Sequence, residues 1–442
     1  MRLAISFLLF VLQFTSSAQT LSNFGNNQHD STVNAVVNDA AIFNGKLYLG
    51  GSFALINGVA VNSLCSYDGT TTAQIGALNA NVLDLEIFNN KLFVAYTGVT
   101  SGVAFWNDTA LQYTAFSGLT DSYVFALQAH NGSLYVSGCF KVNNQYYVLA
   151  QYDGTSWSYH GTCTISKAGA LDMAIFNNDI LLGGAFDTVN GISFGKSIIR
   201  FDGSSFLSYS SPLGICTSLL IEGNSVIEGL RKQPANLSPF ANSNGTSFSY
   251  LSDTIFAEAD AGRVFQTSGL HFYAAAKQRD NIMGESFAAG VLYLKQGQNY
   301  VPLTDSIYGT ETPYLIKELP EDILRGVIKF QNQWIVYGAF KSTSALAIYP
   351  QNILAVIGSV LGEEETALAK PATLYPNPTK GFLFFEDVSS NESYTILNLQ
   401  GETLKTGKLT STLNTSNLPA GVYIFLREGK HPAWRQCFIK LD

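Results

Sequence analysis

Charged residues are scarce in this chain of 442 residues. Only 13% of them are Asp, Glu, Lys or Arg, whereas 46% are hydrophobic and 13% are aromatic. A disordered chain has few apolar residues and much charge, so this composition excludes disorder over most of the length. Acidic residues outnumber basic ones by 33 to 25, and the resulting net charge of −8 argues against a nucleic-acid partner.

Long hydrophobic runs are also lacking. The longest apolar run near the start, Leu3–Phe14, is shorter than the roughly 20 residues that a membrane-spanning helix needs. It follows the positive charge of Arg2 and precedes the small residues Ser16–Ala18. This order is typical of a secretory signal, so we expect residues 1–18 to be a signal peptide and the mature protein to have no transmembrane segment.

Cysteines are few and scattered, which excludes a disulfide scaffold and a zinc site of the Cys-x-x-Cys kind. The five are Cys65, Cys139, Cys163, Cys216 and Cys437. An exported protein can still form one disulfide, and Cys163 and Cys216 each stand two residues after a glycine. Because the sequence also has no P-loop, H-E-x-x-H, G-x-S-x-G or EF-hand motif, we expect no metal and no cofactor.

What the sequence does contain is a repeat. The segment Ala41–Phe53 returns most clearly as Gln128–Phe140 and Ala174–Phe186. Aligned on Phe43, the copies fall at positions 43, 88, 130, 176, 222, 268 and 330. A period of about 45 residues is typical of a propeller or a solenoid.

Each repeat has the pattern of four strands, with an Asn-Gly or Asn-Asn turn after the first and an aromatic-Asp-Gly turn after the third. A four-stranded sheet cannot bury both of its faces alone, but seven such sheets around an axis can. We therefore predict an all-β protein with a seven-bladed β-propeller over residues 19–358. Both Thr20–Gly25 and Asn352–Gly358 fit the strand that completes the last blade.

The end of the chain differs in character. A charged stretch over residues 359–371 is predicted to be a linker. Short alternating strands follow over residues 372–442, and they predict a small Ig-like β-sandwich.

The repeats resemble those of kelch and galactose-oxidase-type propellers, because Gly50–Phe53 is followed by Tyr67–Gly69, a Gly-Gly-x-Phe and then an aromatic-Asp-Gly motif. The copper site of galactose oxidase is not implied, since no matching Tyr, His and Cys set is present.

The C-terminal module resembles the type A C-terminal sorting domain of Bacteroidota type IX secretion cargo. The residues that carry this resemblance are Pro376, Asn377, Pro378, Gly381, Gly401, Gly421, Val422, Tyr423 and Lys440. The resemblance implies that the type IX secretion machinery is a partner. It also implies that the protein is secreted or attached to the outer cell surface.

Three carboxylates recur at one repeat position, four residues before the aligned residue: Asp39, Asp84 and Asp172. Glu86 lies on the same strand face as Asp84. Because the innermost strands of a propeller line its axis, these side chains could form an acidic ring that binds a cation or a polar ligand. The alternative is that each Asp accepts backbone N–H bonds from the neighbouring blade.

Two classes of function fit these observations. The first is a secreted or cell-surface binding or adhesion propeller that recognises an extracellular glycan or protein. The second is a secreted carbohydrate-active hydrolase or lyase, which would need a facing pair of carboxyl groups about 5–9.5 Å apart at the axis. The recurrence of the three Asp residues reflects the repeat itself, so we favour binding over catalysis.

Overall fold

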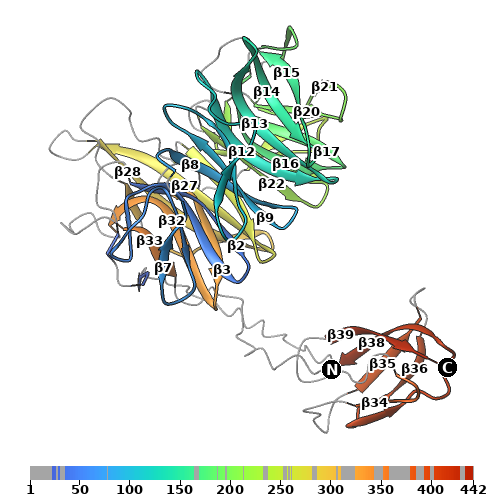
Figure 1. Cartoon of the computed structure of the whole chain (residues 1–442). Helices are drawn as coiled ribbons and strands as arrows, with labels where there is room; N and C mark the ends of the chain where they lie inside the picture. The colour runs from blue at the N-terminus through green and yellow to red at the C-terminus, as the bar shows by residue number, and fades with distance from the viewer. Residues whose placement is uncertain are drawn as a thin grey trace, which may run out of the picture. The chain divides into compact units, whose positions relative to one another are not determined.

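The computed structural model divides the chain into two compact units, Met1–Val360 and Leu361–Asp442 (Figure 1). The residues that the structure describes are 22–25, 28–29, 35–76, 78–163, 169–186, 188–194, 197–212, 214–231, 237–251, 256, 259, 261–280, 286–304, 307–309, 324–342, 352–357, 379–384, 393–398, 403–428 and 434–441. The predicted signal peptide and linker, Pro376–Pro378 and Gly401 lie outside them. No helix within these residues is long and apolar enough to cross a membrane.

Most described strands of the first unit fall into seven antiparallel groups of four, which we call blades one to seven, and some of these groups belong to a larger sheet. Blades one and two consist of β2 (Val36–Phe43), β3 (Lys46–Ser52), β6 (Leu64–Tyr67) and β7 (Thr72–Gln74), then β8 (Asn81–Phe88), β9 (Lys91–Thr97), β10 (Gly102–Trp106) and β11 (Leu111–Tyr113). Blades three and four consist of β12 (Tyr123–His130), β13 (Ser133–Val142), β14 (Gln145–Tyr152) and β15 (Trp157–Cys163), then β16 (Ala170–Phe176), β17 (Asp179–Gly184), β20 (Ile198–Phe201) and β21 (Phe206–Ser208).

The remaining blades share one continuous sheet. Blades five and six consist of β22 (Ile215–Glu222), β23 (Ser225–Arg231), β24 (Phe240–Ser243) and β25 (Phe248–Tyr250), then β26 (Ala261–Thr267), β27 (Leu270–Asp280), β28 (Ser286–Gln296) and β29 (Asn299–Pro302). Blade seven consists of β31 (Gly326–Phe330), β32 (Gln333–Ser342), β33 (Asn352–Ile357) and β1 (Ser22–Asn23). The short strand β30 (Ile307–Gly309) pairs with β28 and β32 and so bridges blades six and seven.

Turn chemistry explains the regular spacing of the strands. Asn44 and Gly45 join β2 to β3 with φ values of 48° and 74°, the left-handed conformation that a tight hairpin requires. After the third strand, one oxygen of Asp68 accepts hydrogen bonds from the backbone N–H groups of Thr70 and Thr71 at 2.8 and 2.7 Å. The same turn recurs at Asn107, Asp153, Asp202 and Asn244.

Apolar side chains fill the space between consecutive blades. Seven described clusters each join two neighbours, and the last one packs blade seven against blade one. In that cluster Ile335 and Leu354 of blade seven meet Leu47 and Leu49 of blade one. This is a β-propeller, as the repeat predicts (Figure 1). Its groups of four strands are consistent with seven blades.

The N-terminal strand closes the ring. Ser22 and Asn23 pair with Val356 and Ala355, so β33 is the third strand of blade seven and β1 is the fourth. Phe24, which follows β1, is fully buried in the cluster between blades seven and one.

The second unit has two small antiparallel sheets around a core of its own. One pairs β34 (Phe382–Phe384) with β37 (Thr412–Asn414). The other has the order β36 (Thr403–Lys408), β35 (Ser393–Leu397), β38 (Gly421–Glu428) and β39 (Trp434–Lys440). Leu383 from the first sheet and Ile396, Phe425 and Phe438 from the second share one buried cluster, in agreement with the predicted small sandwich.

Candidate ligand cavity on the propeller axis

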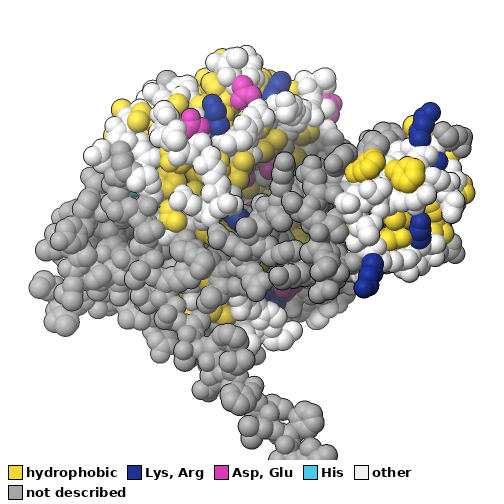
Figure 2. Space-filling model, turned by 90° about the horizontal axis from the view of Figure 1, so that it is seen from below, with side chains coloured by type: hydrophobic (Ala, Val, Ile, Leu, Met, Phe, Trp, Pro, Cys, Tyr) yellow, Lys and Arg dark blue, Asp and Glu magenta, His cyan; other side chains and the backbone are white. Residues whose placement is uncertain are grey.

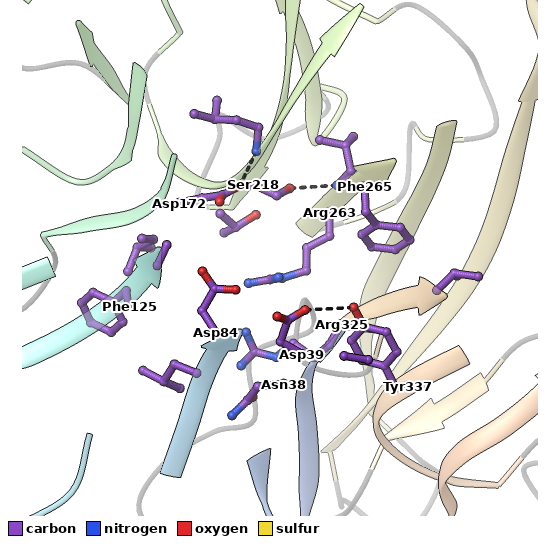
Figure 3. Close-up of a pocket in the computed structure, with 18 of the residues that line it drawn as sticks. Asn38, Asp39, Asp84, Phe125, Asp172, Ser218, Arg263, Phe265, Arg325 and Tyr337 are labelled. Carbon is purple, nitrogen blue, oxygen red and sulfur yellow. Dashed lines mark hydrogen bonds between the residues drawn. The ribbon is translucent and has the colours of Figure 1, made fainter. Parts of the chain in front are cut away.

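The first strands of all seven blades line a cavity of about 590 Å³ on the propeller axis (Figure 3). Asp39 of β2, Asp84 of β8 and Asp172 of β16 reach it from three of these strands. The structure therefore brings together three of the four acidic residues that the sequence singles out. The fourth, Glu86, is not among the described residues that line this cavity, and its carboxylate accepts the Ala129 N–H of blade three at 2.8 Å.

A recurring β-bulge sets the direction of these side chains. In blades one to five the register of the first strand shifts just before the aspartate position, for example between Val37 and Asp39. A bulge re-aims a side chain and releases it from the regular ladder. Each bulge therefore turns two successive residues of its strand toward the axis.

Each aspartate is tied to the next blade. Oδ2 of Asp39 accepts the N–H of Leu85 at 2.9 Å, and Oδ2 of Asp172 accepts the N–H of Leu219 at 2.7 Å. Oδ2 of Asp84 likewise accepts the N–H of Leu127 at 2.5 Å. The geometry thus fits the alternative hypothesis for the repeated aspartates, in which each one accepts a backbone N–H of the neighbouring blade.

Sequence reasoning missed a fourth member of this set. Ser218 of β22 stands at the same repeat position, and its Oγ accepts the N–H of Val264 at 2.8 Å. Blade three has Ala126 there and cannot make the bond. In blade four the N–H of Met173 therefore has no acceptor from blade three at this position. It donates instead to Oδ1 of the preceding residue, Asp172, at 2.8 Å.

Burial and mutual repulsion disturb the titration of the carboxyl groups. Burial raises the pKa of Asp39. Burial and the neighbouring charge of Asp39 raise the pKa of Asp84 well above its usual range. Burial also raises the pKa of Asp172 to about 6, although backbone N–H groups and the charge of Arg263 oppose the shift.

Cationic side chains line the same cavity, which the sequence analysis did not foresee. They are Arg231 at the end of β23, Arg263 of β26 and Arg325, which directly precedes β31. Figure 3 shows the side chain of Arg263 reaching toward the carboxyl groups of Asp84 and Asp39. The expected ring of acids is therefore a mixed ring of carboxyl and guanidinium groups.

The repeat register contained a signal for two of these arginines. Arg263 and Arg325 each stand five residues before the aligned residue of their repeat, at positions 268 and 330. The corresponding residues of the other five blades all line the cavity as well: Asn38, Leu83, Phe125, Leu171 and Thr217. Because this position varies in residue type, its recurrence is visible only from the spacing.

Aromatic side chains complete the lining. Phe125 and Phe265 both face the cavity. The ring of Phe125 lies parallel to that of Tyr123, with centroids 6.0 Å apart and planes within 4°, and Tyr123 is 50% exposed. The cavity thus combines hydrogen-bonding groups of both signs with flat apolar surfaces. Within the described residues, no group of three His, Cys, Asp or Glu side chains is placed to hold a metal ion.

Comparison with known proteins identifies the end of the chain. Residues 373–439 match the secretion system C-terminal sorting domain family. The protein is therefore exported, and it is secreted or held at the cell surface. No curated protein matches the chain by sequence.

Solved structures that are similar to this chain are propeller-like and distant in sequence. A structure of YCF48 bound to D1 peptide is 11% identical, with a TM-score of 0.44 over 78% of this chain and 99% of that one. The extracellular domain of the putative hybrid two-component system BT3049 from B. thetaiotaomicron is also 11% identical, with a TM-score of 0.44 over 96% of this chain and 57% of that one. The β-propeller domain of Myceliophteria thermophila Cps50 (Swd1) is 11% identical, with a TM-score of 0.38 over 69% and 94%. These similarities concern the fold alone.

Two described residues of the sorting motif, Tyr423 and Lys440, are buried inside the second unit. Tyr423 is buried, its ring stacks on Phe438 at 5.4 Å, and its hydroxyl donates to the Pro419 carbonyl at 2.8 Å. Lys440 is also buried, and its Nζ donates to the Leu441 carbonyl.

Of the two described glycines of the motif, only Gly381 stands where a larger residue would meet a close neighbour. A Cβ on Gly381 would lie 2.8 Å from Oγ of Ser416, and one on Gly421 would lie 3.5 Å from the Tyr423 hydroxyl. Val422 is 42% exposed, and Figure 2 shows hydrophobic side chains open to solvent on this unit.

Proposed function

We propose that this protein is an exported binding protein whose axial cavity holds a carboxylated saccharide. The observation that carries the proposal is the set of arginines, Arg231, Arg263 and Arg325, which come from three blades and line one cavity. A guanidinium group matches a carboxylate in a planar, bidentate manner, so it is the side chain best suited to recognise a uronic acid.

The rest of the lining suits the rest of such a ligand. Asn38, Thr217 and Ser218 supply hydroxyl and amide groups for sugar hydroxyls, and Phe125 and Phe265 supply faces on which a pyranose ring can pack. A volume of about 590 Å³ falls within the range of small-ligand sites. The parallel pair of Phe125 and the half-exposed Tyr123 would extend this surface beyond the cavity.

Binding is favoured over catalysis because the carboxyl groups are already engaged. Oδ1 of Asp84 accepts the N–H of Leu85 at 3.0 Å, and its Oδ2 accepts the N–H of Leu127. Oδ1 of Asp39 accepts the hydroxyl of Tyr337 at 3.2 Å. A glycosidase acid or nucleophile needs an oxygen that is directed at the substrate, so this arrangement supports a structural role for both aspartates.

Calorimetry on the full-length protein tests the proposal. Galacturonate and glucuronate oligomers should bind, whereas galactose and glucose oligomers of the same length should not. Arg263→Gln should weaken binding by about 10-fold or more, because a charge-assisted hydrogen bond is lost. Arg200→Gln is the matched control, since Arg200 pairs with Asp179 at 3.4 Å and does not line the cavity.

Two results would contradict this function. Equal affinity for charged and neutral oligomers would exclude recognition of the carboxylate. Release of new reducing ends from the oligomers, lost in Asp84→Asn, would favour the alternative of a carbohydrate-active enzyme. A kelch-like origin of the repeats, an adhesive role and a Bacteroidota host remain predictions from the sequence resemblance.

A further inference from the structure

Two cysteines of blade three lie in contact. The sulfur atoms of Cys139 in β13 and Cys163 at the end of β15 are 4.0 Å apart, although 24 positions separate the residues. Cys139 is buried and Cys163 is half-buried. Cys65 and Cys216, by contrast, are fully buried in the clusters between other blades.

An irregularity in the sheet brings the two thiols together across the intervening strand. β13 and β15 both pair with β14, and the register of β13 shifts between Ser137 and Phe140, where Cys139 lies. Cys163 pairs with Tyr146 of β14, and Lys141 of β13, two residues after Cys139, pairs with the same tyrosine. The bulge therefore lets the Cys139 side chain reach over β14 to Cys163.

We propose that Cys139 and Cys163 form a disulfide bond once the protein has been exported. Sulfur atoms must approach to about 2.05 Å for this bond, so the ends of β13 and β15 have to move closer together as the two side chains rotate. Export places the chain in an oxidising compartment, where such a bond persists. The proposal is independent of the ligand assigned to the axial cavity.

The reaction is thiol–disulfide exchange with an external disulfide, either a small molecule or a protein. Cys163, the less buried of the two thiols, loses its proton, attacks the external disulfide as a thiolate, forms a mixed disulfide and releases one external thiol. The Cys139 thiolate then attacks the Cys163 sulfur, forms the intramolecular bond and releases the second thiol. Two cysteine thiols are oxidised and one external disulfide is reduced, so that atoms and electrons balance. The hydrogen bond between the two thiols lowers the pKa of Cys139 and raises that of Cys163, so the proton of Cys163 is the harder one to remove.

The bond would fix a junction between two blades. Cys163 also pairs with Val189 of β18 (Thr188–Val189), which belongs to the connection between β17 and β20 of blade four. The neighbouring Thr162 carbonyl accepts the N–H of Asn190 at 2.7 Å. Holding the end of β15 to β13 would therefore also hold this contact between blades three and four.

Peptide mapping of protein collected after export tests the proposal directly. Free thiols are alkylated in denaturant without reductant, and the protein is then cleaved with trypsin. The sequence places each of the five cysteines on a separate tryptic peptide, with Cys139 on residues 92–141 and Cys163 on residues 142–167. We expect these two peptides to be joined, with a mass two hydrogens below their sum. Cys65 and Cys216 should carry the alkyl group and serve as internal controls.

Recovery of peptides 92–141 and 142–167 as separate alkylated species would overturn the proposal, as would a link from either of them to another cysteine. A second measurement uses purified, fully reduced protein. Oxidised glutathione should lower the number of titratable thiols by two in the wild type and by none in Cys139→Ser/Cys163→Ser. Oxidation should raise the Tm of the wild type alone, by about 5 °C for a loop of this length. An unchanged thiol count would contradict the reaction.

Discussion

The carboxylate of Asp172 accepts the backbone N–H of Leu219, 47 residues later and in the next blade, at 2.7 Å. Its other oxygen accepts the N–H of Met173 at 2.8 Å. Asp39 and Ser218 make the equivalent bond to their own next blades. Repeated side chains on the axis thus accept backbone N–H groups of the next blade and connect consecutive blades.

Replacing Asp172 tests this structural role. Asp172→Ala removes the acceptor of two N–H groups and should lower the free energy of unfolding by about 1–3 kcal/mol. Asp172→Asn keeps one carbonyl oxygen on the same strand and should lose clearly less. Chemical unfolding of both variants at pH 7 measures the difference. Equal stability of the Ala and Asn variants would show that the bond to Leu219 contributes nothing.

Much of this architecture could be predicted from the sequence, because its signals are local. The Asn-Gly turns, the aromatic-Asp-Gly turns and the period of about 45 residues each appear in short stretches. The structure adds Asn107 and Asn244 to the set of turn residues, since an Asn side chain accepts the same two N–H bonds as an Asp. A search for Asp-Gly alone could not include them.

The site was harder to predict because position on the axis, rather than residue type, defines it. Asp39, Asp84 and Asp172 were visible since they repeat in chemistry as well as in spacing. Arg263 and Arg325 share their position with asparagine, leucine, phenylalanine and threonine in other blades, so no recurring residue type marks it. The strand that closes the ring could not be predicted for a different reason. Thr20–Gly25 and Asn352–Gly358 both had the right pattern, and only the strand pairing shows that the N-terminal segment is the outermost strand of blade seven.

Removing the Phe24 side chain should weaken the closure of the ring. Phe24 is fully buried between blades seven and one, and its ring packs edge-on against Tyr67 at 5.0 Å. Phe24→Ala should cost about 3–5 kcal/mol, as large-to-small changes in a core do. Thermal unfolding measures the effect, and Phe248→Ala, at a residue that is 41% exposed, is the control. A Phe24 variant as stable as the Phe248 variant would contradict closure by the N-terminal strand.

Glu228 should make the propeller less stable as the pH rises. This residue is fully buried, Ser197 and Ser243 donate hydrogen bonds to it, and burial raises its pKa from 4.5 to about 7. The folded state therefore binds the proton more tightly than the unfolded state. The stabilisation is complete below pH 4.5 and is lost as the pH rises through 7.

Glu228→Gln removes this titration while keeping an oxygen for the two serine hydroxyls. We expect the variant to equal the wild type near pH 4 and to exceed it by about 3 kcal/mol at pH 8. Unfolding curves of both proteins at several pH values give the difference in their free energies of unfolding. The contributions of other titrating groups cancel in this difference. A difference that does not change with pH would show that Glu228 has the same pKa in the folded and unfolded states.

Deleting residues 361–442 should block export without unfolding the propeller. The first unit has its own closed set of clusters, and the sorting domain match lies entirely within the second. Cell fractionation should find the shortened protein in the periplasm. The purified protein should show the circular dichroism and the thermal transition of a folded β protein. Normal appearance of the shortened protein outside the cell would contradict the sorting assignment.

Two adjacent residues of the sorting motif should affect export for different reasons. Tyr423 is buried and stacks on Phe438, so Tyr423→Ala should destabilise the second unit by about 3–5 kcal/mol and reduce export through misfolding. Val422 is 42% exposed and pairs with Ile439, which is 41% exposed. Exposed apolar neighbours of this kind mark a contact surface, so Val422→Glu should leave the unit folded and still lower the exported fraction.

The ratio of protein outside the cell to protein in the periplasm measures export, and thermal unfolding of the purified variants measures folding. Leu404→Glu is the control, because Leu404 is 45% exposed on β36, which does not pair with the strand of Val422. If Val422→Glu is exported normally while Tyr423→Ala is not, the motif acts only through the fold of the domain. The other outcome is that Val422→Glu is folded but stays in the periplasm, while Leu404→Glu is exported normally. That result would show that the secretion machinery contacts the β38–β39 face.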